Sequence, residues 1–373
     1  MKWVKKFVFL AVVASIAAAL CFSANAADVE DGQAEALEIE EIEKSVPQSA
    51  KDMLGDINIQ SAEDAGGALA AVKDAVVGSL KGIFGDAAKA GLSFVAVALL
   101  TGLVTSICPP DSGKYASYVE FAGAVSVAAL AVDGTGALMT AGSEMIGELY
   151  AFSKALLPTL SAAAAAGGAV SSAAAQYAAA AVFMDVILTV ETSLMLPLVY
   201  GYFLTSVCGA ALDNSGVQSA AKMIKWTAVT LLSASVLALT VYLMVSGVVL
   251  GTADDAAVKL AKTAISTALP VIGSIAADAS GAVVAGINTL KNILGVFGLI
   301  VIIAVCAVPI LKLAAFSIAV KVASAFTAAL GNKKLSGAID AVSSAYALIL
   351  GICGSAGIAL FVSVIAVLRT VTG

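Results

Sequence analysis

The feature that most constrains this chain is a series of apolar runs, each long enough to cross a membrane as a helix. The run AGLSFVAVALLTGLVTSIC, residues 90–108, holds nineteen residues without a charged side chain. A helix needs about 20 apolar residues to cross the hydrocarbon core of a bilayer. Over the whole chain 60% of the residues are hydrophobic and 12% are charged, whereas about a quarter are charged in soluble domains. The sequence therefore predicts an all-α, polytopic transmembrane helix bundle.

Several such segments follow one another, and two regions leave their number open. The predicted spans are residues 90–108, 116–132, 144–170, 178–212, 226–250, 292–311, 313–330 and 345–368. Residues 133–170 and 256–291 mix apolar positions with polar residues, glycine and proline, so we expect about 6–8 crossings, with broken or re-entrant helices. Proline lacks the N–H that a helix interior uses. The expected helix breaks are Pro158, Pro197, Pro270 and Pro309.

The first 26 residues have the pattern of a signal peptide. Lysines precede a long apolar stretch, and Ala24-Asn25-Ala26 supplies small residues at a cleavage site. An uncleaved signal anchor is the alternative. In both cases the following segment starts outside the cytoplasm.

The chain between the signal peptide and the first span changes character once. Residues 27–66 are acidic, and twelve of the 26 Asp and Glu lie between Asp28 and Asp64. We expect this exported segment to be disordered, or a loose helix broken near Pro47. Apolar residues at intervals of three and four then predict an amphipathic interfacial helix over residues 67–89. Residues 90–373 are the predicted membrane domain.

Lysine and arginine placement predicts the orientation, because cytoplasmic loops are enriched in these residues. An extracytoplasmic N-terminus places Lys114 in the cytoplasm, and Lys222 and Lys225 fit the same side. Arg369 fits a cytoplasmic C-terminus. Lys333 and Lys334 do not fit this scheme unless one of the middle segments is re-entrant.

Composition excludes several classes of function. Histidine is absent, which removes histidine metal sites and the Ser-His-Asp triad. Four cysteines remain after the signal peptide, without CxxC spacing, and we expect small apolar packing residues: Cys108, Cys208, Cys306 and Cys353. No phosphate-binding or dinucleotide motif occurs, so neither a cofactor nor an enzyme is expected. The net charge of −6 without a basic patch argues against a nucleic-acid partner.

Two carboxyl groups fall deep inside a predicted span. Asp185 and Glu191 lie in residues 178–212, where an ionisable group costs about 2.5–3.5 kcal/mol on insertion scales. They are six residues apart and so point to different faces of a regular helix. Two interpretations of Asp185 and Glu191 are equally open. The carboxyl groups either form polar contacts inside the bundle or lie on a transport pathway.

The segment ADASGAVVAGINTLKNILG, residues 277–295, combines polar residues and glycines directly before an apolar run. Such backbone is tolerated at membrane depth only where it is buried in protein or lines a cavity, and broken helices build central sites in transporters. The candidate pore or polar-core residues here are Asp278, Ser280, Asn288, Lys291 and Asn292. The alternative is an extracytoplasmic loop capped by Asp278.

The same part of the chain resembles a known family. Residues 268–326 resemble the signature region of the stage III sporulation protein AE family, in which a Pro-Val/Ile-Gly turn precedes an Asp-Ala pair, a Leu-Lys-Asn triplet and a glycine-punctuated span that ends in proline. The matching positions are Pro270 to Gly273, Asp278-Ala279, Leu290-Lys291-Asn292, Gly295, Gly298 and Pro309. Residues 156–174 supply a second similarity through a proline, an alanine-rich run and Gly-Gly-Ala-Val.

The resemblance implies a membrane subunit of the channel complex between mother cell and forespore in endospore-forming bacteria. It implies a multi-pass protein of the mother-cell membrane around the forespore, partnered by ring-forming sporulation proteins, and leaves a homo-oligomer open. The subunit would act as pore, gate or platform. The family supplies no catalytic residues. A self-contained secondary transporter using intramembrane carboxylates is the alternative, and an intramembrane enzyme is disfavoured by the absence of histidine, GxSxG and paired aspartates.

Overall fold

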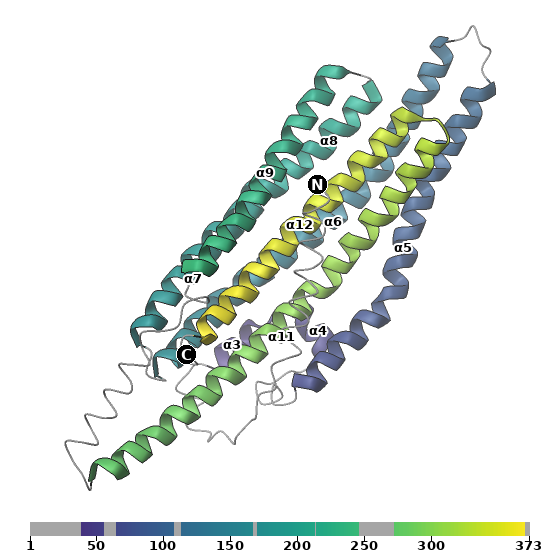
Figure 1. Ribbon diagram of the computed structural model, residues 1–373. Coiled ribbons are helices and arrows are strands. Elements are labelled where there is room, and N and C mark those ends of the chain that lie inside the picture. Colours follow the sequence, from purple (N-terminus) through teal and green to yellow (C-terminus); the bar gives the residue numbers. More distant parts are fainter. Residues whose placement is uncertain are drawn as a thin grey trace.

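The protein is a bundle of long helices that lie side by side (Figure 1). The computed structural model describes residues 39–55, 65–107, 113–166, 170–212, 214–245 and 272–369, with the backbone alone over 39–41, 65–66, 113–114, 170–172, 243–245, 272–292 and at residue 369. Throughout these residues the regular secondary structure is helical, which confirms the predicted all-α class. The signal peptide and Pro270 lie outside the described residues.

Six helical segments in the described part of the chain are long and apolar enough to cross a membrane, so the protein is a multi-pass membrane bundle. One of the six joins α7, the π-helical turn η3 and α8. The helices are α3 (Ile39–Ser45), α4 (Gln48–Leu54), α5 (Ala65–Ile107), α6 (Gly113–Ala166), α7 (Val170–Val190), η3 (Glu191–Met195), α8 (Leu196–Leu212), α9 (Ser215–Val245), α11 (Ile272–Ala329) and α12 (Lys333–Arg369).

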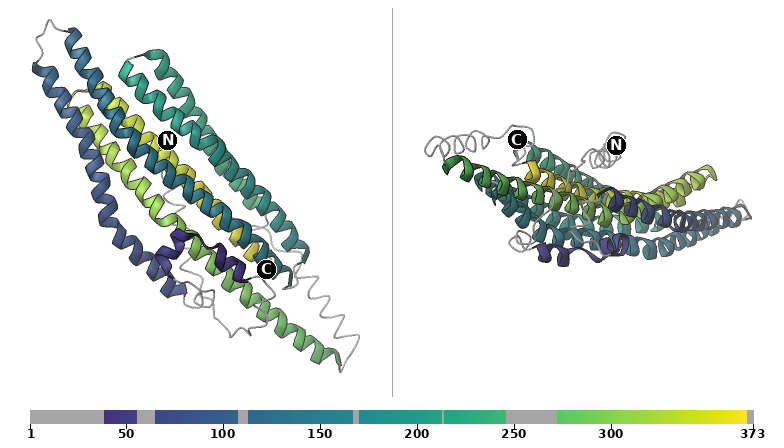
Figure 2. Two further views of the ribbon diagram at one scale, coloured as in Figure 1. Left: turned by 180° about the vertical axis from the view of Figure 1, so that it is seen from behind. Right: turned by 90° about the horizontal axis from the view of Figure 1, so that it is seen from below.

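Successive long helices run in opposite directions, as the views from the front and from behind both show (Figures 1 and 2). One end of the bundle holds Ile107, Leu212 and the turn at Gly331, and we call it the turn end. The opposite end holds Ala166 and Arg369. The α8–α9 pair lies on one flank and α5 on the other, with α6, α11 and α12 between them (Figure 2).

Helix α12 is the central element. It contacts α6, α7, α8, α9 and α11, and its side chains are buried on most sides, including Ala338, Ile349 and Leu360. A helix that is apolar all round belongs in the interior of a bundle. The continuous apolar sequence of residues 345–368 therefore reflects burial in protein rather than contact with lipid.

Two pairs of serines join α11 to α12. The Ser317 hydroxyl donates to the carbonyl of Ser343 at 3.3 Å, and the Ser343 hydroxyl donates to the carbonyl of Ser317 at 2.9 Å. Ser324 and Ser336 repeat the arrangement at 3.0 and 3.1 Å. The pairs are seven residues apart on each helix, and small side chains of this kind let two membrane helices approach closely.

The hairpin between α11 and α12 is closed by a glycine. Gly331 has a φ of +84°, a left-handed conformation that glycine adopts without steric cost. The Asn332 side chain then accepts from the backbone N–H of Leu335 at 3.1 Å, which caps the start of α12. Gly-Asn at this point thus ends one helix and starts the next.

In two places, a pair of spans that we expected to be separate forms one continuous helix. Residues 116–132 and 144–170 were expected apart, but α6 runs through Gly134, Gly142 and Pro158 to Ala166. Both glycines lie against α12, where a Cβ would come within 3.1 Å of the Tyr346 hydroxyl or 3.0 Å of the Cys353 sulfur. They provide space for a neighbouring helix and do not interrupt the backbone.

Helix α11 is likewise continuous through Pro309 and Lys312. A proline removes one hydrogen bond from a helix, and membrane helices tolerate that loss when neighbouring groups support the backbone. The breaks expected at Pro158 and Pro309 are therefore absent. Residues 272–292 form the start of α11, so this segment is neither a loop nor a separate re-entrant element.

The described residues before residue 90 are mostly helical. The predicted interfacial helix over residues 67–89 and the span 90–107 are one helix, α5, because nothing between them interrupts helical backbone. Helices α3 and α4 lie on either side of Pro47 and dock on the bundle through Ile42, Val46 and Ala50, all buried. These three residues come from α3, from the connection between the helices and from α4. A helix broken near Pro47, one of the two expected alternatives, is the arrangement found over residues 39–55.

We predict that Gly298→Ala destabilises the bundle. A Cβ at Gly298 would lie 2.5 Å from Leu156, which is fully buried and has no room to move. Overpacking of this kind costs about 1–3 kcal/mol. The measurement is the free energy of unfolding of the purified protein in detergent.

Gly147→Ala in α6 is the matched control. Nothing lies within 4 Å of a Cβ at Gly147, and alanine favours a helix over glycine by about 1 kcal/mol. We expect this variant to be as stable as the parent or more so. Equal stability of the two variants would contradict close packing between α11 and α6.

Candidate functional site

The polar segment before residue 293 lies on α11. Asp278, Ser280, Asn288, Lys291 and Asn292 are all within its helical backbone, but their side chains lie outside the described part of the chain. This portion of α11 extends past the end of α12 at the end opposite the turns (Figure 1). A role for these five residues as pore or polar core stays a prediction.

Asp185 lies on the outer surface of the bundle. Its carboxylate accepts a hydrogen bond from the Tyr150 hydroxyl of α6 at 2.5 Å, and the Lys154 ammonium lies 4.0 Å from the centre of the Tyr150 ring. Both ionic side chains are exposed. Asp185 therefore belongs to a polar contact between α6 and α7, on a different face from Glu191.

Glu191 is the single Asp, Glu, Lys or Arg side chain among the described residues that is buried in the interior, with an exposure of 0%. The Ser355 hydroxyl of α12 lies within hydrogen-bond distance of its Oε1, at 2.6 Å. Its Oε2 has no hydrogen-bond partner among the described residues. A buried polar atom without a partner is uncommon and marks a position under functional or structural constraint.

A π-helical turn carries this carboxyl. Over Glu191–Met195 the helix widens, and the N–H of Leu196 donates to the carbonyl of Glu191, five residues back. Pro197 follows directly and has no N–H to donate, which removes the regular hydrogen bond to residue 193. The turn accommodates the proline without ending the helix. The break expected at Pro197 is thus a π-turn, a feature often found at functional sites.

The hydrogen bonds around Glu191 fit a neutral carboxylic acid. The Ser355 Oγ lies 2.6 Å from Glu191 Oε1 and 2.9 Å from the carbonyl oxygen of Ile352 on the same helix. Because a hydroxyl has one proton, Ser355 cannot donate to both oxygens at once. If the carboxyl is protonated, it donates to Ser355 and Ser355 donates to Ile352, so both contacts are satisfied together. Glu191 is buried without a contacting cation among the described residues, which favours the same neutral form.

The remaining neighbours of Glu191 are soft and weakly polar. Met195 lies one turn further along, and the Ser235 hydroxyl of α9 lies 3.9 Å from its sulfur. Cys353, two residues before Ser355, is buried and unpaired, as is Cys306 of α11. Within the described part of the chain no three Cys, Asp or Glu side chains come together as a metal site.

Sequence reasoning found Glu191 but not its surroundings. Ser355 lies 164 positions further along the chain, and no local pattern connects the two residues. Tyr150 and Lys154 were equally unassigned as partners of Asp185. Pro197 did signal a disturbed helix, because proline in a helix always removes one backbone hydrogen bond.

We predict that Ser355→Ala destabilises the bundle only when Glu191 is present. The substitution leaves both carboxyl oxygens without a partner, which costs about 1–3 kcal/mol. In a Glu191→Leu background no carboxyl remains, so we expect Ser355→Ala to be almost neutral. A double-mutant cycle of unfolding free energies in detergent measures the difference, and an equal cost in both backgrounds would contradict the contact.

Comparisons with known proteins identify the family. The family model described as stage III sporulation protein AE matches residues 65–372. The curated stage III sporulation protein AE of Bacillus subtilis (strain 168) is 22% identical over 201 residues, which are 54% of this chain and 50% of that protein, so the match spans about half the length of that relative. No solved structure matches the chain significantly. Since the family model covers well over half of the sequence, this chain belongs to the stage III sporulation protein AE family.

Proposed function

We propose that this chain is an integral membrane subunit of the complex that connects mother cell and forespore during endospore formation. Membership of the stage III sporulation protein AE family over residues 65–372 is the observation that carries the proposal. Six helices able to cross a membrane are consistent with a multi-pass protein of the mother-cell membrane around the forespore. The role is not catalytic.

Within that complex the chain acts as a gate or platform that ring-forming partners complete. The interior of the described bundle is filled by apolar side chains such as Phe152, Phe203 and Phe297, each almost fully buried. A core filled in this way supports a closed, packed state. A pore formed with partners, or between copies of the chain, would lie outside this core.

An extracytoplasmic N-terminus is part of the proposal, and the lysines at the turn end support it. Lys222 is near the start of α9, and Lys333 and Lys334 begin α12, so all three belong to the turn end. Lysine enrichment favours the cytoplasmic side. This arrangement accounts for Lys333 and Lys334, which the sequence alone left unexplained, and it moves Arg369 to the extracytoplasmic side, contrary to expectation.

We predict the following accessibility in a variant whose native cysteines are replaced. A cysteine at the exposed position 48 of α4 (Gln48→Cys) should react with a membrane-impermeant maleimide in intact vegetative cells that express the chain, because the extracytoplasmic side of their membrane is open to the medium. A cysteine in the α8–α9 turn (Ser215→Cys) should react only after permeabilisation, because the turn end faces the cytoplasm. Labelling in the reverse order would invert the orientation.

The proposed function itself is tested by purification from sporulating cells. A tagged copy is extracted in mild detergent, and co-purifying proteins are identified by mass spectrometry. We expect ring-forming and single-pass sporulation proteins to be recovered with it. The same preparation from vegetative cells is the control, and recovery of the chain without sporulation partners would contradict the proposal.

The buried Glu191 favours one second candidate, a self-contained secondary transporter. A protonatable carboxyl inside a membrane bundle is the group that proton-coupled transporters use. Purified protein in liposomes distinguishes the two functions. Ion or solute flux by the chain alone, lost in Glu191→Gln, would favour the transporter, whereas dependence on partners would favour the channel subunit.

A further inference from the structure

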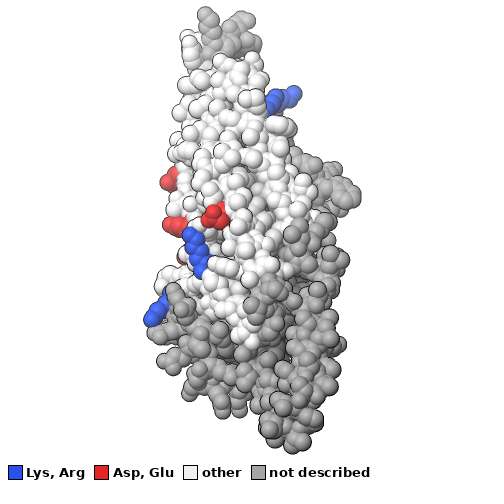
Figure 3. All heavy atoms as spheres, turned by 90° about the vertical axis from the view of Figure 1, so that its left-hand side faces the viewer, with Lys and Arg blue, Asp and Glu red and all other residues white. Residues whose placement is uncertain are grey.

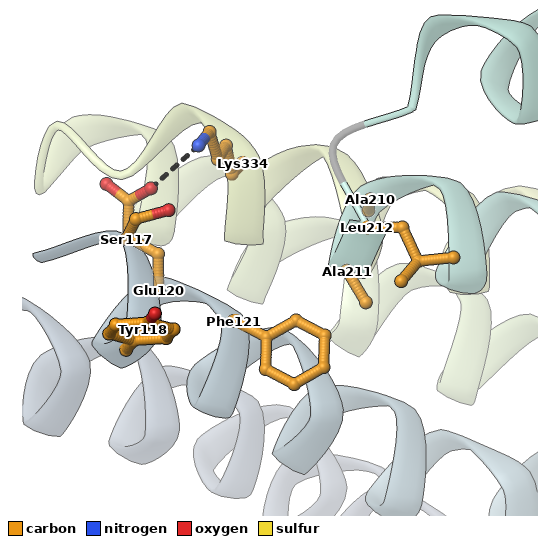
Figure 4. Close-up of a pocket in the computed structure, with 8 residues that line it drawn as sticks. All are labelled: Ser117, Tyr118, Glu120, Phe121, Ala210, Ala211, Leu212 and Lys334. Carbon is orange, nitrogen blue, oxygen red and sulfur yellow. Dashed lines mark ion pairs between the residues drawn. The ribbon is translucent and has the colours of Figure 1, made fainter. Parts of the chain in front are cut away.

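A cleft opens at the turn end between α6, α8 and α12. It has a volume of about 350 Å³ and is lined by Ser117, Tyr118, Glu120, Phe121, Ala210, Ala211, Leu212 and Lys334. This volume falls in the range of about 300–1,000 Å³ that small-molecule sites occupy. Figure 4 shows the charged residues at one side of the cleft, and Phe121 facing Leu212 at the other.

Both signs of charge meet in this cleft. The Lys334 ammonium lies 2.9 Å from Glu120 Oε2, with side-chain exposures of 41% and 32%. The positive amino-terminal end of α12 begins at Lys333, and the negative carboxyl-terminal end of α8 lies at Leu212. The cleft therefore presents a cation and an anion side by side, each accessible to a ligand.

The cleft also lies beside a lipid-facing surface. Large apolar side chains are exposed on the adjoining halves of five helices, among them Leu103, Tyr118, Leu204, Trp226 and Phe326. On the face shown in Figure 3, most of the described surface is uncharged. Exposed apolar surface of this extent faces lipid in a membrane protein, and exposed tyrosines such as Tyr115 and Tyr118 are typical of the headgroup level.

We propose that this cleft binds the headgroup of a zwitterionic phospholipid that carries a primary ammonium, the phosphoethanolamine type. The lipid phosphate accepts hydrogen bonds from Lys334 and Ser117, and the lipid ammonium donates to Glu120. Phe121, Ala211 and Leu212 contact the glycerol and the first carbons of the acyl chains. The headgroup dipole lies antiparallel to the Glu120–Lys334 pair, so each ligand charge faces its opposite.

The chemistry discriminates among membrane lipids. An anionic lipid such as phosphatidylglycerol would satisfy Lys334 with its phosphate but bring no cation to Glu120, so the repulsion between phosphate and carboxylate is left uncompensated. A choline headgroup has no N–H to donate, so it forfeits the hydrogen bond to the Glu120 carboxylate. A primary ammonium satisfies both groups of the cleft at once.

The experiment is lipid retention by the full chain. Protein in mixed micelles with equal mole fractions of dioleoyl phosphatidylethanolamine, phosphatidylcholine and phosphatidylglycerol is exchanged into lipid-free detergent, and retained lipid is measured by native mass spectrometry. Because a charge-assisted hydrogen bond is decisive, we expect phosphatidylethanolamine to be retained about tenfold over either competitor. Glu120→Gln should abolish this preference.

Two further variants keep the test independent of folding. Ala211→Trp fills the cleft and leaves both charges in place, so it should lose the lipid without a change in unfolding temperature. Lys321→Gln removes a lysine from another ion pair between α11 and α12, with Asp340, and should retain the lipid. Equal retention of the three lipids, preference for phosphatidylglycerol, or retention by Ala211→Trp would each overturn the proposal.

Discussion

The contact between α11 and α12 is the interaction on which the rest of the bundle depends. Lipid is as apolar as a leucine side chain, so helices in a membrane associate through close packing and hydrogen bonds rather than through the hydrophobic effect. The reciprocal bonds of Ser317 with Ser343 and of Ser324 with Ser336 supply both. With α12 held in this way, α6, α7, α8 and α9 pack around its other sides.

The sequence predicted the class of fold because helices that cross a membrane need long runs rich in apolar residues and poor in charged ones. It also placed most of these apolar segments correctly. It divided α6 and α11 incorrectly because glycine and proline have two uses. Gly134 and Gly142 interrupt an apolar pattern, yet their lack of a side chain serves the contact with α12. Whether a glycine ends a helix or admits a neighbour depends on residues 200 positions away, which no local pattern reveals.

At the candidate site, too, the sequence did not reveal which residues lie in contact. Glu191 stood out because a carboxyl in an apolar segment is costly, but its partner Ser355 and its full burial follow only from the packed structure. Asp185 carried the same signal and lies on the outside, bonded to Tyr150. Burial therefore separates two carboxyls that the sequence treated alike, since Glu191 is buried and Asp185 is exposed.

The length of the helices connects the fold to the proposed complex. Helix α6 has 54 residues, about 80 Å at 1.5 Å per residue, whereas a bilayer core is about 30 Å thick. The exposed charges of α5 before residue 90, such as Lys73 and Asp86, and those of α6 after residue 143, such as Glu144 and Lys154, lie in the half of the bundle away from the turns. If the turn end faces the cytoplasm and the chain belongs to the complex, as proposed, this charged half would extend beyond the membrane into the space between mother cell and forespore, where ring-forming partners would meet it.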